Sequence, residues 1–377
     1  MRVRFEVSKV LDAIEKRLST DPALARGVVD LAEVVRYADL DGGRPATLLR
    51  LGLVVDALSR RLAEENVVVY VVVDRALLSD ADLTSNERMV IRRWADDGLV
   101  EVLPGAGDRT LEVADLTGLP VISRRPYDDQ RERRPWLGEP GRLLCPGYGP
   151  GNATIEPAVP GGPQPPSRAT VRGQEVLARL WRCPEPGCAA FGPSRAGRPG
   201  GQPPPRLRDG VPVCPRHDEK LLAAGPRPAA EVLVARVDGT VRQRFVVSSD
   251  QPVVVGRAPD GLDQGPGVLM LGPWLAEEAR RWISRSHVVL EILGDDLVAR
   301  DVSTNGTVVR VGGSRAESDR LMLTRDQVRL LGDDDVIELY PGVQVARAGQ
   351  WSSGGVANPS SVMADAPTMM IQLPASD

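Results

Sequence analysis

Three short polar clusters in the last third of the chain carry residue types that suit the binding of a phosphate group. They are 255–257 (Val-Gly-Arg), 284–287 (Ser-Arg-Ser-His) and 301–307 (Asp-Val-Ser-Thr-Asn-Gly-Thr). A phosphorylated side chain is a dianion with three acceptor oxygens, so an arginine fork together with hydroxyl donors binds it well. Arg257 supplies such a fork, Ser284 and Thr304 supply hydroxyls, and the Asn305 amide is suited to holding a peptide backbone beside the phosphate.

The clusters are separated by apolar runs rich in β-forming residues. Such runs occupy 288–293 and 308–311, and a turn signal stands at 294–296. The pattern predicts an all-β domain with polar loops at one edge. The order Gly-Arg, Ser-Arg-x-His and Asp-x-Ser-Thr-Asn-Gly-Thr resembles that of the FHA domain, a β-sandwich that binds phosphothreonine peptides. This resemblance covers roughly residues 230 to 350.

The resemblance implies roles for individual residues. The positions expected to contact the phosphopeptide are Arg257, Ser284, Arg285, Thr304 and Asn305. Those expected to shape the loops are Gly256, His287, Asp301 and Gly306. About two dozen residues, Trp274 and Trp282 among them, separate the first cluster from the second, and this insertion bears on which peptide side chains are accepted. The alternative is a sandwich that has lost peptide binding, because a fold alone does not establish a function.

Three of the four cysteines and one of the two histidines stand in two short knuckles. The candidate metal ligands are Cys183, Cys188, Cys214 and His217. Cys-x₄-Cys and Cys-x₂-His spacings, with proline and glycine permitting tight turns, let three thiolates and an imidazole meet around Zn²⁺. Four protein ligands leave no open coordination position on the ion, so the zinc is expected to be structural and to hold together a zinc ribbon. Disulfides that include Cys145 are the rival interpretation, and Cys145 is otherwise a spare thiol or a substitute ligand.

The first third of the chain alternates apolar runs with helical patterns. Strands are predicted at 27–31, 67–73, 99–103 and 120–123, and helices at 7–18, 48–63, 86–96 and 111–116. Continuous apolar strands alternating with helices favour a parallel sheet covered on both faces, with ligands at the carboxyl ends of the strands. The fold class is therefore multidomain: an α/β parallel-sheet domain, a small zinc ribbon and an all-β sandwich.

Acidic residues fall at or near those strand ends, and their order is similar to that of the NYN/PIN-like ribonucleases over roughly residues 26 to 137. The resemblance implies a cluster of carboxylates that holds Mg²⁺ or Mn²⁺ and activates water for phosphodiester cleavage. The candidate catalytic residues are Asp30, Glu33, Asp108 and Asp129. Two positions depart from the family: Glu33 stands where an asparagine is usual, and Arg125 where the family has a metal-binding aspartate. A retained fold without catalysis is therefore the alternative.

Two Pro/Gly-rich stretches and a tail of weak pattern complete the chain. The predicted organisation is 1–137 (PIN/NYN-like), 138–176 (linker), 177–225 (zinc ribbon), 228–350 (FHA) and 351–377 (disordered tail). Thr368 in the tail stands three residues before Ile371, a spacing that many FHA domains accept. We therefore treat Thr368 as a candidate site for a Ser/Thr kinase and a ligand for the FHA domain, against the alternative of an ordinary exposed threonine.

Composition sets the remaining expectations. The formal net charge of −4 gives no overall reason to expect nucleic-acid or membrane binding, although the arginine-rich run 124–134 has the residue type that binds RNA. No apolar run is long enough to span a bilayer, and we expect a cytoplasmic protein without a membrane partner. The leading hypothesis is a phosphothreonine-dependent adaptor. The alternatives are a metal-dependent ribonuclease recruited by phosphorylation and a nucleic-acid-binding scaffold.

Overall fold

The computed structural model describes residues 2–149, 152–159, 171–192, 202–259, 267–313, 316–349 and 361–363. The chain divides into two compact units. Unit 1 comprises Met1–Leu62, Val67–Arg227 and Pro359–Asp377, and unit 2 comprises Ala63–Asn66 and Pro228–Asn358. Each unit is described by itself. In the described part of the chain, no helix combines the length and the apolar character needed to cross a membrane.

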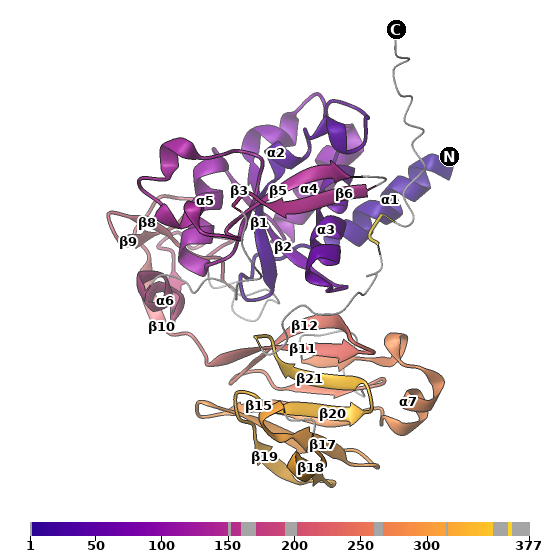
Figure 1. The fold of residues 1–377 in the computed structure, drawn as a ribbon. Helices are drawn as coiled ribbons and strands as arrows, with labels where there is room; N and C mark the ends of the chain where they lie inside the picture. The colour runs from indigo at the N-terminus through magenta and orange to yellow at the C-terminus, as the bar shows by residue number, and fades with distance from the viewer. Residues whose placement is uncertain are drawn as a thin grey trace. The chain divides into compact units, whose positions relative to one another are not determined.

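Unit 1 is built on a six-stranded sheet with the order β3-β2-β1-β4-β5-β6 (Figure 1). The strands are β1 (Ala25–Asp30), β2 (Val68–Asp74), β3 (Glu101–Leu103), β4 (Val121–Ile122), β5 (Leu143–Gly149) and β6 (Asn152–Pro157). All neighbours are parallel except β5 and β6, which form an antiparallel pair. The predicted parallel sheet is thereby confirmed. Strand order reverses direction between β1 and β4, the place where ligands bind in sheets of this kind.

Alternate residues of the central strands face two different apolar layers. Val29, Val69 and Val71 face one layer with the helices α1 (Arg2–Glu15), α3 (Leu49–Leu62) and α4 (Ser85–Asp96). Val28 and Tyr70 face the other with α5 (Gly107–Thr117). Because side chains alternate across a strand and both faces are covered, the strands read as continuous apolar runs.

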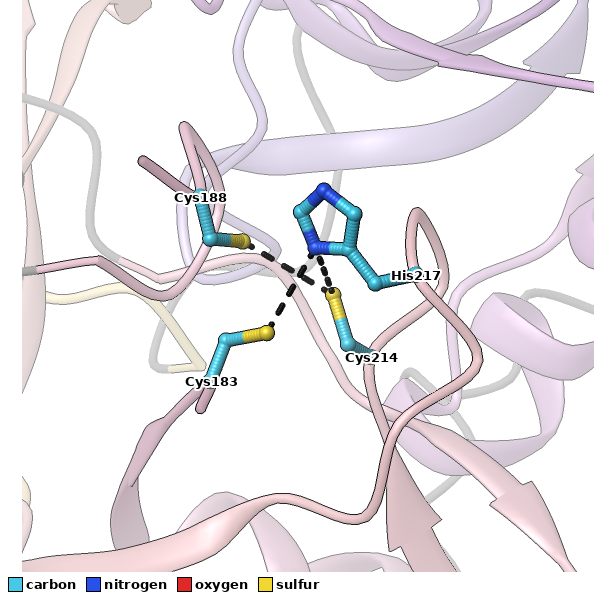
Figure 2. A group of neighbouring side chains, drawn as sticks. All are labelled: Cys183, Cys188, Cys214 and His217. Atoms are coloured by element: carbon cyan, nitrogen blue, oxygen red, sulfur yellow. Dashed lines mark hydrogen bonds between the residues drawn. The ribbon is translucent and has the colours of Figure 1, made fainter. Parts of the chain in front are cut away.

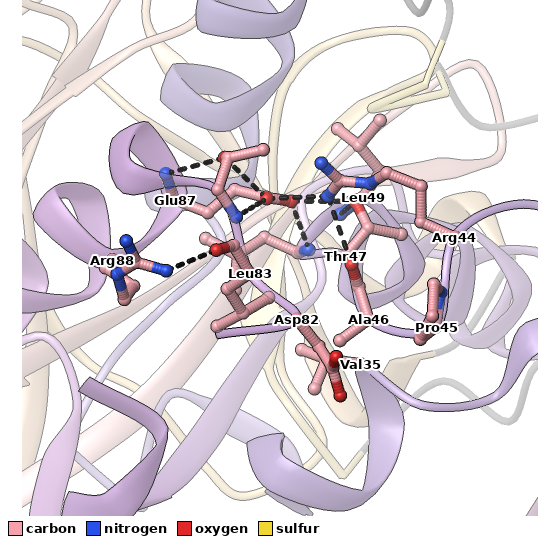
Figure 3. A network of polar contacts seen from close by, with 12 residues as sticks. Val35, Arg44, Pro45, Ala46, Thr47, Leu49, Asp82, Leu83, Glu87 and Arg88 are labelled. Atoms are coloured by element: carbon pink, nitrogen blue, oxygen red, sulfur yellow. Dashed lines mark hydrogen bonds and ion pairs between the residues drawn. The ribbon is translucent and has the colours of Figure 1, made fainter. Parts of the chain in front are cut away.

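A buried glutamate ties the segment before α3 to the start of α4. Glu87, 3% exposed, accepts a hydrogen bond from Thr47 Oγ1 at 2.8 Å (Figure 3). It also forms a capping box with Thr84 and accepts from Leu48 N at 2.9 Å. Arg44 pairs with the same carboxylate at 2.6 Å. Burial raises the pKa of Glu87, but the hydrogen bonds from Arg44 and Thr84 outweigh it and leave the pKa below its ordinary value.

The structure differs from the predicted linker at residues 138–176. The β5–β6 hairpin lies within that range and extends the sheet, and the short helix α6 (Val171–Leu177) lies there too. Leu143 and Leu144 on β5 and Ala153 and Ile155 on β6 are buried, which provides the apolar area that holds the hairpin to the sheet.

The segment after α6 forms two small antiparallel pairs. Strand β7 (Arg179–Arg182) pairs with β10 (Leu222–Pro226), and β8 (Arg206–Arg208) pairs with β9 (Val211–Val213). Asp209 and Gly210 both adopt positive φ, at 49° and 77°. An Asp-Gly pair with positive φ is the preferred two-residue connection of a hairpin, so the sequence sets the β8–β9 turn directly.

Unit 2 is a β-sandwich of two sheets with the orders β12-β11-β21-β20-β17-β18 and β14-β13-β15-β16-β19 (Figure 1). The first sheet contains β11 (Ala230–Val237), β12 (Thr240–Ser248), β17 (Thr307–Arg310), β18 (Arg320–Leu323), β20 (Val336–Tyr340) and β21 (Val343–Arg347). The second contains β13 (Val253–Gly256), β14 (Val268–Met270), β15 (Val288–Leu293), β16 (Asp296–Asp301) and β19 (Val328–Leu330). Inward-facing residues of both sheets form one core, and the predicted all-β fold is confirmed.

Candidate functional site: a loop cluster on the sandwich and a Cys₃His group

The first and second polar clusters meet through their backbones. Arg257 N donates to the carbonyl oxygen of Ser284 at 3.0 Å. A Cβ on Gly256 would lie 1.9 Å from the carbonyl oxygen of Arg285, so the approach is possible only because this residue is glycine. The Gly-Arg spacing therefore places the Arg257 backbone directly beside Ser284.

The second and third clusters are joined by a buried histidine and a hydroxyl. Ser284 Oγ accepts a hydrogen bond from Thr304 N at 3.1 Å. His287, 0% exposed, accepts from Ser284 N through Nδ1 at 3.1 Å and lies 3.2 Å from the carbonyl oxygen of Gly306 through Nε2. These partners require a neutral imidazole with its proton on Nε2. Burial lowers the pKa of His287 below its ordinary value, which favours that neutral form.

A buried carboxylate fixes the shape of the third cluster. Asp301, 0% exposed, accepts hydrogen bonds from Ser303 N at 3.0 Å, Ser303 Oγ at 2.9 Å and Thr307 Oγ1 at 2.5 Å. Gly306 closes the loop with φ of 84°, and a Cβ there would lie 2.9 Å from the carbonyl oxygen of Leu323. The loop-shaping residues expected from the sequence thus have the contacts that this role requires.

The residues expected to contact a ligand lie on the loops that meet here. Arg285, Thr304 and Asn305 are exposed, and Arg257 and Ser284 are half-buried. The Nε atom of Arg257 is buried without a hydrogen-bond partner. A buried guanidinium N–H without a partner is a group that a bound anion would satisfy.

The insertion before Ser284 contributes a short helix, α7 (Glu277–Trp282), that the sequence reasoning did not predict. Asn305 Nδ2 donates to the carbonyl oxygen of Trp282 at 2.7 Å, and the Trp282 ring packs 6.4 Å from that of Tyr340. Asparagine carries a second N–H and an acceptor oxygen, so this bond orients the side chain and leaves it capacity for a ligand. Trp282 itself is 45% exposed beside Asn305.

The predicted metal ligands come together in unit 1. Cys183 follows β7, Cys214 follows β9, and Cys188 and His217 lie in the turns beyond them, with all four side chains pointing toward one centre (Figure 2). Their ligand atoms lie within 4.8 Å of one another. The three cysteines are buried and His217 is exposed. Burial raises the pKa of Cys183, and raises that of Cys214 to about 12, so a cation is needed to hold these thiols as thiolates.

The distances within this group match a tetrahedral zinc site. Cys188 Sγ lies 3.7 Å from Cys214 Sγ, and His217 Nδ1 lies 3.5 Å from Cys183 Sγ and 3.6 Å from Cys214 Sγ. Zn–S bonds of about 2.3 Å and a Zn–N bond of about 2.0 Å at tetrahedral angles place sulfurs about 3.8 Å apart and sulfur and nitrogen about 3.5 Å apart. The donor set and its spacing therefore fit Zn²⁺.

Two of the predicted catalytic carboxylates, Asp30 and Glu33, lie where β1 ends and α2 begins. Asp30, 4% exposed, caps the helix α2 (Leu31–Val34) by accepting from Ala32 N, and burial, followed by the charge of Glu33, raises its pKa. Glu33 accepts hydrogen bonds from Ser123 Oγ and Arg124 N, and Arg125 Nε lies 3.5 Å from it. The polar groups at the switch point are thus paired with one another.

Asp108 and Asp129 line a cavity of about 900 Å³ together with Arg125 and Arg206. A Cβ on Gly107 would lie 3.2 Å from Arg125 Nη1, which places this guanidinium beside the start of α5. Within the residues that the structure describes, the Cys₃His group is the one set of three or more potential metal ligands that converge. Arg125 therefore brings positive charge to the edge where the resemblance implies a metal ion.

The arginine-rich run is largely paired with acidic groups. Arg124 forms two hydrogen bonds with Asp39, at 2.6 and 2.9 Å, and its guanidinium stacks 4.1 Å from the centre of the Tyr37 ring. Arg131 lies 3.3 Å from Asp128. Such pairing reduces the positive potential that attracts RNA.

The chain matches no protein-family model, and no curated protein matches it either. Several of the solved structures that match it are FHA domains. They include the FHA domain of human APLF in complex with an XRCC1 bisphospho peptide (19% identity, 31% of this chain, 97% of that chain, TM-score 0.23). The MEK1 FHA domain matches with 28% identity over 32% of this chain and 88% of its own, with a TM-score of 0.23. The FHA domain of CT664 from Chlamydia trachomatis matches with 20% identity over 31% of this chain and 94% of its own, with a TM-score of 0.21.

Proposed function

We propose that this protein is a phosphothreonine-dependent adaptor that binds phosphorylated partners through the loop cluster of unit 2. The observation that carries the proposal is the junction of three loops at which Ser284 Oγ accepts from Thr304 N while the buried Nε of Arg257 has no hydrogen-bond partner. A phosphate dianion offers the acceptor oxygens that such donors need.

In the proposed complex each residue has a separate task. Arg257 pairs with the phosphate through its guanidinium, and the hydroxyls of Ser284 and Thr304 donate to the remaining oxygens. Arg285 and Asn305 contact the peptide on either side of the phosphothreonine. His287 and Asp301 hold the loops in position, since both are buried and bonded to the loop backbones.

The phosphorylated ligand implies a Ser/Thr protein kinase as the enzyme that creates it, and the proposed setting is the cytosol. Thr368 is a candidate ligand on the same chain, although it lies outside the described residues. A peptide of residues 362–375 carrying phosphothreonine at 368 tests this point. It is expected to bind more tightly than the unphosphorylated peptide, and equal affinity would remove Thr368 as a ligand.

Unit 1 is proposed to supply a structural zinc site and a further contact surface. The Cys₃His group would hold Zn²⁺ through three thiolates and the Nδ1 atom of His217, and the metal would fix the turns that carry these four residues. The metal-dependent ribonuclease and RNA binding by the arginine-rich run remain predictions from the sequence. The pairing of Arg125 with Glu33 at 3.5 Å weighs against a resident Mg²⁺ or Mn²⁺ at that place.

The proposal is tested with a library of phosphothreonine peptides and matched libraries that carry threonine or phosphoserine. The full-length protein is expected to retain phosphothreonine peptides more than threonine peptides, because the proposed hydroxyl and guanidinium donors bind the phosphate. Equal retention of all three libraries would remove phosphate recognition from the account.

A further inference from the structure

A three-residue segment from the tail is packed against the α/β sheet domain of unit 1. It comprises residues 361–363, the short yellow segment beside α3 in Figure 1. Val362 is 6% exposed and belongs to the apolar cluster that contains residues of α1 and α3. A Cβ on Gly52 would lie 2.6 Å from Met363 Sδ and 3.1 Å from Ile14 Cδ1, so the missing side chain of Gly52 makes the room that Met363 occupies.

One carboxylate of α3 accepts three hydrogen bonds from this segment. Asp56, 4% exposed, accepts from Val362 N at 2.7 Å through Oδ1, and through Oδ2 from Ser361 Oγ at 2.5 Å and Met363 N at 3.1 Å. Hydrogen bonds to an ionised acceptor are among the stronger ones in proteins. A carboxylate that is covered to this degree needs such partners, and the tail supplies three.

We infer that residues 361–363 are a releasable anchor for the tail, with Asp56 as its receptor and Ser361 as the residue whose phosphorylation releases it. Ser361 is exposed, and its hydroxyl both donates to Asp56 and accepts from Met363 N at 3.1 Å. A protein kinase would transfer the γ-phosphoryl group of ATP to Ser361 Oγ, which forms a P–O bond and releases ADP and the hydroxyl proton. The product no longer has the hydroxyl that donates to Asp56, and it places a dianion beside that carboxylate.

Release changes how far the tail can reach. Thr368 follows Met363 by five residues, and a span of that length reaches at most about 17 Å. While residues 361–363 are bound to Asp56, Thr368 can therefore reach no farther than this distance from α3. After release, this limit no longer applies. The inference rests on the contacts of Asp56 alone and does not require that the sandwich bind phosphopeptides.

The methyl group of Met363 reports on the anchor directly. The full-length chain is labelled with ¹³C-methyl methionine, and the Met363 signal is assigned by its loss in Met363→Leu. Phosphoserine incorporated at position 361, or Ser361→Glu, is expected to shift this signal to the position of an exposed methionine. The anchored fraction is expected to fall by about tenfold or more relative to the released fraction, because like charges at this distance repel.

Ser361→Lys is the matched control, since it adds a side chain of similar length and opposite charge. Its Met363 signal is expected to stay at the anchored position, and adding Asp56→Asn to Ser361→Glu is expected to restore anchoring. Equal release by lysine and glutamate would show that bulk alone acts and would overturn the role of charge. An unchanged signal with phosphoserine would overturn the release mechanism, and a signal that depends on protein concentration would show that the anchor joins two copies.

Discussion

Replacing Cys188 by serine should unfold the β7–β10 segment of unit 1 while leaving the parallel sheet intact. Cys188 is 0% exposed, and its Sγ lies 3.7 Å from that of Cys214, so the change removes one of four converging ligands. Arg109 bonds to the carbonyl oxygens of Pro204 and Pro205 just before β8, but the apolar core of the β7–β10 segment is small. Among its described residues the buried apolar cluster contains, besides the cysteines, only Phe191 and Leu221.

The sizes of the two contributions decide the outcome. Burying Phe191 and Leu221 stabilises the β7–β10 segment by about 1.5–3 kcal/mol each, or about 3–6 kcal/mol in all. Zinc bound by cysteines and histidines in small domains contributes about 10–16 kcal/mol. The metal therefore outweighs the apolar core, and losing it should leave the strands β7 to β10 without a stable fold.

Metal analysis and hydrogen exchange test this expectation together. The purified protein is expected to contain zinc at one equivalent, and Cys188→Ser is expected to contain much less. Amides of β7 to β10 should lose their protection in that variant and on chelation, whereas those of β1 and β2 should keep theirs. Cys145→Ser is the control, since Cys145 lies on β5 outside the cluster, and it should behave as the original protein does. Full protection of β7 to β10 after complete removal of metal would refute a structural zinc site.

Three further predictions concern buried or paired charges. Arg109→Met should destabilise unit 1 by about 3–5 kcal/mol in urea unfolding, because Arg109 is 0% exposed and its loss leaves the buried Glu101 unpaired; a cost below about 1 kcal/mol would contradict this. The chain has two histidines, so an NMR titration can follow His287 directly, and the pKa of His287 should lie below the ordinary 6.5. The unfolded state then binds the proton at a higher pH than the folded state does, so the free energy of unfolding should fall as the pH drops below 6.5. A pKa at or above 6.5 would contradict the neutral imidazole. Single-stranded RNA should not be cleaved in a way that EDTA stops, and cleavage that is lost in Asp108→Asn would instead favour the ribonuclease.

The loop cluster of unit 2 and the Cys₃His group could be predicted from the sequence, because the residues of each come from a few short contiguous motifs. The cysteine knuckles converge as their spacing indicates, and Ser284 meets Thr304 although 20 residues separate them. Gly256 and Gly306 are parts of the same motifs, and the structure shows why they must be glycine: one approaches a carbonyl oxygen closely and the other has positive φ.

Other features could not be predicted from the sequence, because the contacting residues are far apart in the chain or because the composition hides the pattern. Proline and glycine in β5 and β6 obscure the alternation of buried residues such as Ala153 and Ile155, so the sequence predicts a linker where the structure has a hairpin. The tail anchor is three residues long, has no period to detect, and bonds to Asp56 about three hundred positions earlier. Arg109 similarly bonds to the carbonyl oxygen of Pro204, which only the folded chain brings near.

We propose that the guanidinium of Arg257 binds the phosphate group. Titration with a selected phosphothreonine peptide tests this proposal most directly. Arg257→Ala should weaken binding at least tenfold, since a hydrogen bond to a charged group contributes about 1.5–3 kcal/mol. Arg329→Ala is the matched control, because Arg329 lies on β19 of the same sandwich and should leave affinity unchanged. Both variants should keep the unfolding temperature of the original protein within a few degrees. Unchanged affinity of a folded Arg257→Ala variant would contradict the account.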